Sequence, residues 1–407
     1  MPPVALDKLK SGEILSQDVR DINGRLLLTK GKTIDIDHIR LLKIWGVPEV
    51  FVHDVKQEPA SSKEKDGEKT ARIELGVRTM FRNIDTEHPA IAAVLKAAID
   101  HRCRHDLFME YEPVKPLSPD FRLDLYSAVQ TQIQFSKIDL PESPQIMMRF
   151  NKVVAEPHAS GNDIAEVVAT SPSLAAIVLK IVNSAAFGLT SKVDTLSHAV
   201  ALLGTHEIGM LIMGISIMRL FHNIPQKLID MRTFIRHAVA CGLLSRILAA
   251  QINMRKTEPI FVAGLLHDVG RLIWYRYFPE QAKLSLEIAR KTGLALYHIE
   301  KECLGISHEQ IAGQLFTKWN LPDNLANIIL YHHRPSRSPE PAGPALVQMA
   351  DLAVNALSLG QSGEHIIPCF ESGAWNQLGI SSNALTAAIG QTVQQVEIME
   401  TLFLTEL

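Results

Sequence analysis

The sequence predicts a mainly α-helical protein, an all-helical bundle with a small α+β module at its N-terminus. Aromatic residues account for only 6% of the 407 positions, whereas alanine, leucine and isoleucine abound, and such a composition favours helices. Apolar residues recur at helical spacing along much of the chain, for example from Leu174 to Val182. Short helices of this kind, joined by turns of a few residues, are typical of a compact bundle.

Length, charge and cysteine content narrow the class of protein. A chain of 407 residues is too long for one ordinary domain and predicts two or three. A formal net charge of −3 argues against a dedicated nucleic-acid binder, which would carry a basic excess. The four cysteines lie far apart without a CxxC pair, which is typical of reduced thiols in a cytoplasmic protein.

Two further features favour a cytoplasmic protein without a membrane span. No signal peptide is apparent, because charged residues soon follow the opening Met1–Val4. The longest apolar run, Ile208–Met218, is too short to cross a bilayer and predicts a core helix.

Residues 1–55 are predicted to form the small α+β module. Leu26–Thr29 has the pattern of a strand and follows a turn signal at Gly24. Ile36–Trp45 has the apolar spacing of a helix, and a second strand is predicted at Val50–Val52.

Residues 56–70 are polar and mixed in charge, which predicts a flexible linker, and 71–135 are predicted to form a helical connector. Within the connector His101 and His105 lie four residues apart on one helix face, a spacing that can bind a metal. Two neighbouring arginines would repel a cation and no carboxylate partner is evident. We therefore expect no metal site at this pair.

The stretch Ala263–Leu272 contains a polar pair within an apolar run. His267 and Asp268 lie between Leu266 and Val269, which have the spacing of a buried helical stripe. A carboxylate there is costly to bury unless it is paired, hydrogen-bonded or bound to a metal. Neutral imidazole and carboxylate are both good ligands for transition metals. A helix end that carries two polar residues is the alternative.

Further histidines and one aspartate fall in other predicted helices or at helix ends: His237, His308, His332, His333 and Asp351. Asp351 lies among apolar neighbours, where an unpaired carboxylate would be strongly destabilising. With His267-Asp268, His237 and Asp351 offer ligands for one ion. The other three histidines could serve a second ion or hold a phosphate. Each histidine also has a structural alternative, as a core residue, a helix cap or a helix terminus.

Four motifs within residues 138–335 resemble the successive signatures of the HDOD domain: Asp139–Pro144, Ser171–Leu174, Lys180–Gly188 and Ala199–Gly204. That family is an all-helical relative of the HD phosphohydrolases, found in bacterial signalling proteins. The resemblance implies an HD-like helical bundle over residues 136–335. Within the third motif, Asn183 and Ser184 have the simpler interpretation of a helix cap.

The N-terminal module resembles the domain that often precedes HD-GYP phosphodiesterase domains. The resemblance rests on the patterns at Ser11-Gly12, Asp21–Gly24 and Gly46–Val52. It implies no catalytic residue in the module.

The HDOD resemblance also implies a role for the polar residues. The order His237, His267-Asp268, Asp351 is the metal signature of the HD superfamily. His308 and His332-His333 match the further ligands of the HD-GYP subgroup. Such sites usually hold a divalent metal, Fe or Mn, and the family chemistry is hydrolysis of phosphate esters. On this basis Asp268 and Arg271 are candidate catalytic residues.

The sequence departs from the catalytic pattern in three places. His332-His333 is followed by Arg-Pro-Ser-Arg instead of the Gly-Tyr-Pro loop of HD-GYP proteins. Arg271 replaces the lysine that commonly follows the His-Asp pair, and Thr233 stands where some trinuclear members have a carboxylate. The HDOD family is generally regarded as lacking demonstrated phosphodiesterase activity.

We therefore expect a bacterial signalling regulator that binds a divalent metal and acts through a protein partner or a small nucleotide ligand. A metal-dependent phosphohydrolase acting on a nucleotide or cyclic dinucleotide is the alternative. A C-terminal helical extension, 336–407, is expected to pack on the helical core or to mediate self-association, which leaves a homodimer open.

Overall fold

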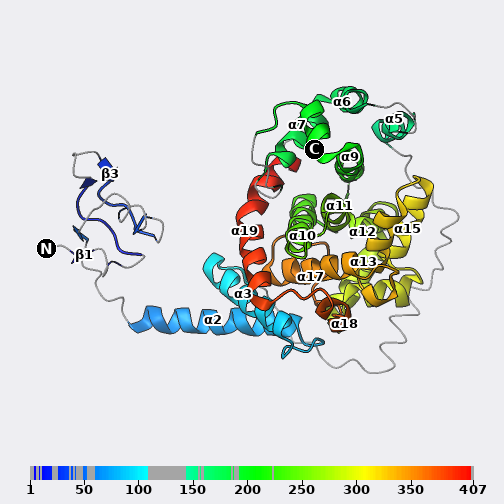
Figure 1. Ribbon diagram of the computed structural model, residues 1–407. Helices are drawn as coiled ribbons and strands as arrows, with labels where there is room; N and C mark the ends of the chain where they lie inside the picture. Colours follow the sequence, from blue (N-terminus) through cyan, green and yellow to red (C-terminus); the bar gives the residue numbers. More distant parts are fainter. Residues whose placement is uncertain are drawn as a thin grey trace. The chain divides into compact units, whose positions relative to one another are not determined.

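In the computed structural model, the described residues are parts of 4–52, then 60–108, 144–154, 156 and 160–404 with short gaps within 185–191 and at 222–223 (Figure 1). The chain divides into two compact units, Met1–Ala71 and Arg72–Leu407. Several predicted features lie outside the described residues: the turn at Gly24, most of the helix at 36–45, the second part of the connector and the start of the first HDOD motif.

The first unit contains two short antiparallel strand pairs. β1 (Val4–Ala5) pairs with β4 (Glu49–Val50), and β2 (Val19–Arg20) pairs with β3 (Leu26–Leu28). β3 and β4 correspond to the two predicted strands. Gly31, in the turn after β3, has a φ of 83°, a conformation that glycine adopts without strain.

Residues 60–70 were assigned by composition to a flexible linker, and that assignment is wrong for this part of the segment. They lie in helix α2 (Ala60–Met80). The segment is rich in lysine and glutamate, which have high helix propensity. It continues into a stretch where Ile73, Val77 and Met80 are buried in the second unit, so the polar part extends an anchored helix.

The second unit is helical in its described residues. Its earlier helices are α3 (Pro89–His105), α5 (Gln145–Val154), α6 (Gly161–Ala169), α7 (Pro172–Val182), α8 (Leu196–Leu203), α9 (Thr205–Leu220), α10 (Met231–Gln251), α11 (Glu258–Leu266) and α12 (Val269–Tyr277). Its later helices are α13 (Pro279–Thr292), α14 (Leu296–Ile299), the π-helical turn η2 (Glu300–Leu304), α15 (His308–Lys318), α16 (Asp323–Tyr331), the 3₁₀ turn η3 (Pro335–Arg337), α17 (Ala342–Leu357), α18 (Ser372–Asn376) and α19 (Ser382–Leu404).

Helix α10 lies at the centre of this unit and packs against α11, α17 and α19 (Figure 1). Helix α3 packs against α17 and α19. The described parts of the predicted connector and C-terminal extension therefore share one packed core with α10. By length and composition α10 could cross a bilayer, but 83% of its apolar window is buried inside the unit, as in core helices generally.

Local capping signals in the sequence coincide with several helix ends. The hydroxyl of Ser160 accepts from the backbone N–H of Asp163 at the start of α6, and Pro172 is the first residue of α7. Asn183 follows α7, where its Nδ2 donates to the carbonyl of Leu179 and its Oδ1 accepts from the backbone N–H of Val193. The interpretation of Asn183 as a helix cap is confirmed. Residues 208–218 are buried in α9, as predicted for a core helix.

The apolar run around His267-Asp268 is divided between two helices. α11 ends at Leu266 and α12 begins at Val269, so the polar pair occupies the break. Asp268 has φ −99° and ψ 11°, outside the α-helical region. The flanking apolar side chains are buried as predicted. The break places the polar pair next to α10 and α17.

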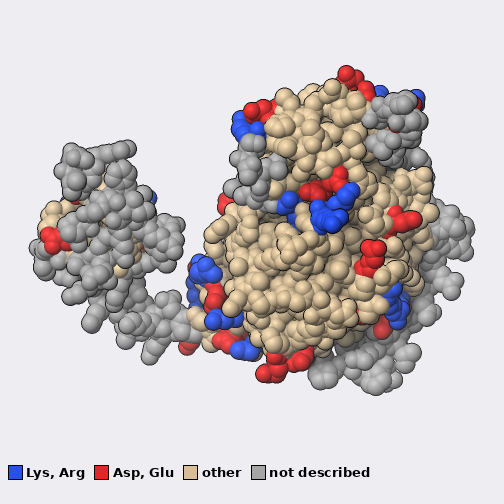
Figure 2. Space-filling model, viewed as in Figure 1, with Lys and Arg blue, Asp and Glu red and all other residues tan. Residues whose placement is uncertain are grey.

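Charged side chains on the viewed face of the second unit are scattered and mixed in sign (Figure 2). No broad basic stripe crosses the described part of that face. This agrees with the formal net charge of −3.

Candidate metal centre

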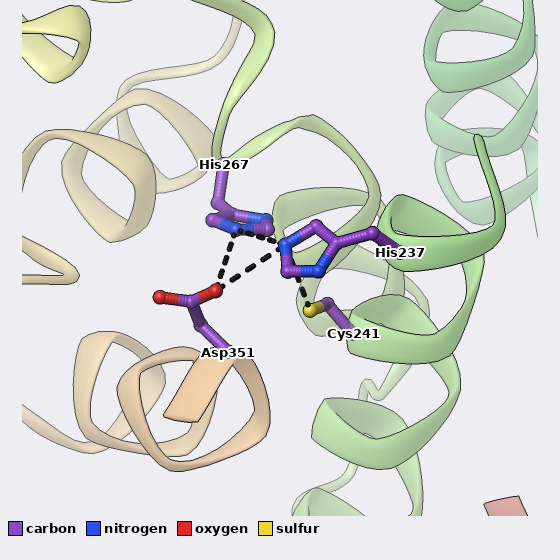
Figure 3. Close-up of side chains that lie close together, drawn as sticks. All are labelled: His237, Cys241, His267 and Asp351. Carbon is purple, nitrogen blue, oxygen red and sulfur yellow. Dashed lines mark hydrogen bonds and ion pairs between the residues drawn. The ribbon is translucent and has the colours of Figure 1, made fainter. Parts of the chain in front are cut away.

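Four side chains converge where α10, α17 and the end of α11 meet (Figure 3). This first cluster consists of His237, Cys241, His267 and Asp351. The two Nε2 atoms of His237 and His267 are 3.3 Å apart. Oδ1 of Asp351 lies 3.3 Å from Nε2 of His237 and 3.4 Å from Nε2 of His267. All four side chains are buried.

A second cluster consists of His308, His332 and His333, which are also buried. His308 is the first residue of α15, and the paired histidines follow the last residue of α16. Nε2 of His308 lies 3.4 Å from Nε2 of His332 and 3.3 Å from Nε2 of His333. The paired histidines do lie at a helix terminus, as the structural alternative predicts. That alternative does not explain why both rings point to His308.

Asp268 lies between the two clusters. Its Oδ2 is 3.3 Å from Nε2 of His267, in the first cluster. Its Oδ1 is 3.1 Å from Nε2 of His308, in the second cluster. The two oxygens of one carboxylate thus face different histidine groups, which is the arrangement of a ligand that bridges two cations.

Hydrogen bonds at the far side of the rings fix which nitrogen faces the centre. Nδ1 of His267 contacts the carbonyl of Gly264 at 2.7 Å, and Nδ1 of His332 contacts the carbonyl of Ile329 at 2.7 Å. Nδ1 of His308 contacts Oε2 of Glu300 at 2.5 Å. A ring nitrogen beside an acceptor carries a proton, so the neutral form of each of these rings presents an unprotonated Nε2 to the centre.

These spacings fit ligands of a common cation. Two nitrogens that are each about 2.1 Å from one ion, at angles between about 90° and 110°, are roughly 3.0–3.4 Å apart. The Nε2 pairs in both clusters fall in that range. In their neutral forms His308 and His332 direct the lone pairs of their Nε2 atoms at one another, and an ion between them removes the repulsion. The residues therefore fit a metal.

The charges of the centre favour added positive charge. Burial alone would raise the pKa of Asp268 and Asp351, but neighbouring cationic and histidine groups hold the pKa of both carboxyls well below the usual range. Burial would lower the pKa of His267, yet the carboxylates of Asp268 and Asp351 raise it to about 10. A proton or a metal ion at this point is therefore stabilised.

Two histidines of the second cluster, His332 and His333, favour the neutral imidazole, whereas, against the effect of burial, the Glu300 carboxylate raises the pKa of His308. Burial, together with the neighbouring histidines His267 and His308, lowers the pKa of His332 to about 3. Burial also places the pKa of His333 well below its usual value. The neutral ring is the form that binds a metal.

Arg271 binds Asp268 within a network of buried polar groups. Its Nη1 donates to Oδ2 of Asp268 over 2.9 Å and to Oγ of Ser362 over 2.8 Å. Its Nε donates to Glu300 over 3.0 Å and its Nη2 to Glu364 over 3.2 Å. These bonds use four of the five guanidinium donors. These contacts hold the Asp268 carboxylate in place, and a catalytic role for Arg271 stays a prediction.

Two glycines allow the helices to approach closely enough to form the centre. A Cβ on Gly264 of α11 would lie 2.8 Å from the carbonyl oxygen of Cys241 in α10. A Cβ on Gly270 of α12 would lie 2.0 Å from the carbonyl oxygen of His308. Both distances are shorter than real Cβ contacts, so a larger residue would separate elements that carry ligands.

The structure brings together all seven residues predicted as ligands. Their metal binding remains a prediction, because it rests on side-chain geometry. His101 and His105 stay apart from this centre, with ring centroids 4.5 Å from each other, and no third ligand joins them among the described residues.

Sequence reasoning missed four supporting residues: Cys241, Glu300, Asn355 and Glu364. Cys241 follows His237 by four residues, so helical spacing could have identified it. Asn355 likewise follows Asp351 by four residues and donates to its Oδ1 over 2.7 Å. Glu300 and Glu364 lie in a π-helical turn and an irregular segment, and no periodic signal marks them.

The helical fold and the paired histidine clusters bridged by an aspartate define the class of HD-like helical domains. Residues 140–335 match the model of the HDOD domain, so the chain contains an HDOD domain over this range, as the motifs predicted. Asp351 lies beyond its end and reaches the centre on α17.

Known proteins share this fold at low identity. A protein from Geobacter sulfurreducens, an HDOD domain protein of unknown function, has a TM-score of 0.51 at 20% identity, covering 70% of this chain and 98% of its own. A candidate signal transduction protein from Marinobacter aquaeolei VT8 has a TM-score of 0.51 at 21% identity, covering 80% of this chain and 68% of its own. A candidate phosphohydrolase from Shewanella amazonensis SB2B has a TM-score of 0.51 at 20% identity, covering 69% of this chain and 97% of its own.

An uncharacterized protein from Treponema pallidum (strain Nichols) is 24% identical over 233 residues. The match covers 56% of this chain and 45% of the relative. These likenesses establish the fold, and they leave the activity to be argued from the centre itself.

Proposed function

We propose that the HDOD domain binds two divalent cations at adjacent sites and serves as a regulatory module in bacterial signalling. The observation that carries the proposal is the position of Asp268, whose two oxygens face separate histidine clusters. The ligands would be His237, His267 and Asp351 for one ion and the second cluster for the other, with Asp268 shared. Imidazole and carboxylate ligands suit Fe, Mn and Zn.

Charge balance supports the proposal. Asp268, Asp351 and Glu300 each have a lowered pKa and are ionised at neutral pH. The guanidinium of Arg271 contacts two of these carboxylates, Asp268 and Glu300. When the imidazoles are neutral, as metal binding requires, three buried negative charges face one positive charge, and two negative charges are left uncompensated. Buried charge without compensation is strongly unfavourable, and divalent cations offset it.

A regulatory role is favoured because Arg271 has little capacity left for a substrate. Four of its donors are already bonded to protein groups, so it offers a phosphoryl group at most one hydrogen bond. The segment after His333 also lacks the Gly-Tyr-Pro loop of the hydrolytic subgroup. The module would then act by presenting a surface to a protein partner or a small nucleotide ligand.

A phosphohydrolase is the second candidate, favoured by the bridging position of Asp268. Metal ions at such a pair make a bound water nucleophilic and neutralise phosphoryl oxygens. In that case Asp268 would hold the two sites at a fixed separation and Arg271 would hold the Asp268 carboxylate in place.

The experiment combines metal analysis with an activity assay. Purified full-length protein is analysed for metal content, then tested for hydrolysis of a generic phosphodiester with added Mn²⁺ or Fe²⁺. A metal-loaded protein without turnover supports the regulator. Turnover that disappears in Asp268→Ala, but persists in the control Asp194→Ala, favours the hydrolase. Asp194 is 69% exposed and pairs with Lys192, so its loss leaves the centre unchanged. Protein that binds no metal contradicts both candidates.

A further inference from the structure

Cys241 lies at the first cluster and has no place in the ligand pattern that the sequence suggested. It is on α10, one helical turn after His237, so both side chains point to the same side of the helix (Figure 3). Its Sγ is 3.6 Å from Nε2 of His237. Sulfur, the two imidazole nitrogens and the Asp351 oxygen all lie within 4.8 Å of one another.

The sulfur distance agrees with ligation by a thiolate. A sulfur about 2.3 Å and a nitrogen about 2.1 Å from the same ion, at a tetrahedral angle, are roughly 3.6 Å apart. The observed separation between Sγ of Cys241 and Nε2 of His237 has that value. The histidine and aspartate spacings in the same cluster, 3.3–3.4 Å, fit the same geometry.

We propose that Cys241 is a further ligand of the first metal ion, which adds a thiolate to the two imidazoles, the Asp351 carboxylate and the shared Asp268 carboxylate. The inference rests on the proposed metal binding and extends it in two ways. A thiolate is a soft ligand, so the site would select Zn²⁺ or Fe²⁺ over Mn²⁺ and Mg²⁺. Five protein ligands, with Asp268 shared between the two ions, would also close the coordination sphere of the first ion.

A closed sphere has a functional consequence. Structural zinc sites have four protein ligands, whereas catalytic sites keep one position for water or substrate. With Cys241 in place, the first ion would hold α10, α17 and the break at His267-Asp268 together. An open position would then belong only to the second cluster. This deepens the regulatory proposal, because the first ion would stabilise the fold and only the second ion could bind a water or a substrate.

Cobalt reports directly on the ligands. Metal-free full-length protein is titrated with Co²⁺ alone and followed by absorption spectroscopy. Visible d–d bands report that cobalt is bound at either cluster, and a near-ultraviolet sulfur-to-cobalt charge-transfer band reports a thiolate ligand. We expect both signals in the wild type. A variant that keeps Cys241 but carries Cys103→Ser, Cys303→Ser and Cys369→Ser is expected to retain both.

The Cys241→Ser variant is expected to keep d–d bands from the second cluster and to lose the charge-transfer band. Its zinc affinity at the first site should fall by at least roughly 100-fold, the upper range for losing even an indirect supporting contact. X-ray absorption of the zinc-loaded wild type provides a measurement without substitution and should show a sulfur shell at about 2.3 Å.

The outcomes separate this inference from the proposal beneath it. If the wild type shows d–d bands but no charge-transfer band, Cys241 is not a ligand. If the charge-transfer band persists in Cys241→Ser, Cys241 is again not a ligand. Both results leave metal binding intact. An absence of all cobalt bands overturns metal binding itself.

Discussion

Arg271 donates a 2.9 Å hydrogen bond to Oδ2 of Asp268, the oxygen that also faces His267 of the first cluster. A buried guanidinium therefore orients the carboxylate that lies between the two histidine groups. Glu300 extends this arrangement, since it accepts from Arg271 and also contacts Nδ1 of His308. The two clusters thus share a single supporting network of buried charges.

Removal of the Arg271 side-chain charge should destabilise the fold strongly. Arg271→Met leaves Asp268, Glu300 and Glu364 without their common donor, and a buried pair that loses one partner costs about 3–5 kcal/mol. Urea unfolding should show this loss in the free energy of unfolding. Arg78→Ala removes an exposed helix pair with Glu74 and is the control, with an expected change of about 0.5 kcal/mol or less. Equal losses in the two variants would contradict the network.

Glu364 should make stability depend on pH. Burial raises its pKa to about 7 from an ordinary 4.5, so the folded state holds a proton that the unfolded state has released. The resulting stabilisation is fully present below pH 4.5 and is lost as pH rises through about 7, a change of roughly 3 kcal/mol. Unfolding free energies of the wild type and Glu364→Gln, measured from pH 4.5 to 8, should diverge accordingly. Parallel curves would show that the carboxyl is ionised throughout.

Asn355 should tune metal affinity without being a ligand. It donates to Oδ1 of Asp351, the oxygen that faces both imidazoles of the first cluster. Loss of such an outer contact typically lowers metal affinity by about 10–100-fold. Competition with a chromophoric chelator should show this for Asn355→Ala, whereas the exposed Asn376→Ala should bind zinc as the wild type does. Unchanged affinity in Asn355→Ala would contradict a supporting role for Asn355.

Gly270 should be intolerant of a methyl group. Its Cβ would lie 2.0 Å from the carbonyl oxygen of His308, so Gly270→Ala forces α12 and α15 apart. Overpacking of this kind costs about 1–3 kcal/mol, and here it also displaces a predicted ligand. Gly390→Ala is the matched control, because open space surrounds that position in α19 and the change should stabilise by about 0.5–1 kcal/mol. Thermal unfolding and metal content measure both effects. A stable Gly270→Ala with full metal content would contradict the proposed fit.

Sequence patterns predicted the parts of the fold that depend on neighbouring residues. Ser160, Pro172 and Gly204 mark helix boundaries because capping is a local interaction. The helix at 60–70 was missed because polar composition also suits a linker, and only burial further along α2 distinguishes the two. The break at His267-Asp268 depends on tertiary contacts that apolar periodicity does not contain.

The predicted ligands of the candidate centre could be chosen from sequence, but the residues that surround and hold them could not. Buried histidines and aspartates in apolar helices are costly without partners, so His237, His267 and Asp351 could be selected from sequence. Cys241 was overlooked, although it lies one turn from His237, because it resembles a small apolar core residue. Glu364 reaches Arg271 from 93 positions along the chain, and no local pattern specifies such a contact.

The central claim is that Asp268 lies between two metal ions. Anomalous diffraction from crystals of the zinc-loaded protein tests it most directly. We predict two peaks about 3.5–4 Å apart, one among His237, His267 and Asp351 and the other among His308, His332 and His333. Crystals that show no anomalous peak among these side chains, at zinc concentrations that saturate the protein in solution, would contradict the account.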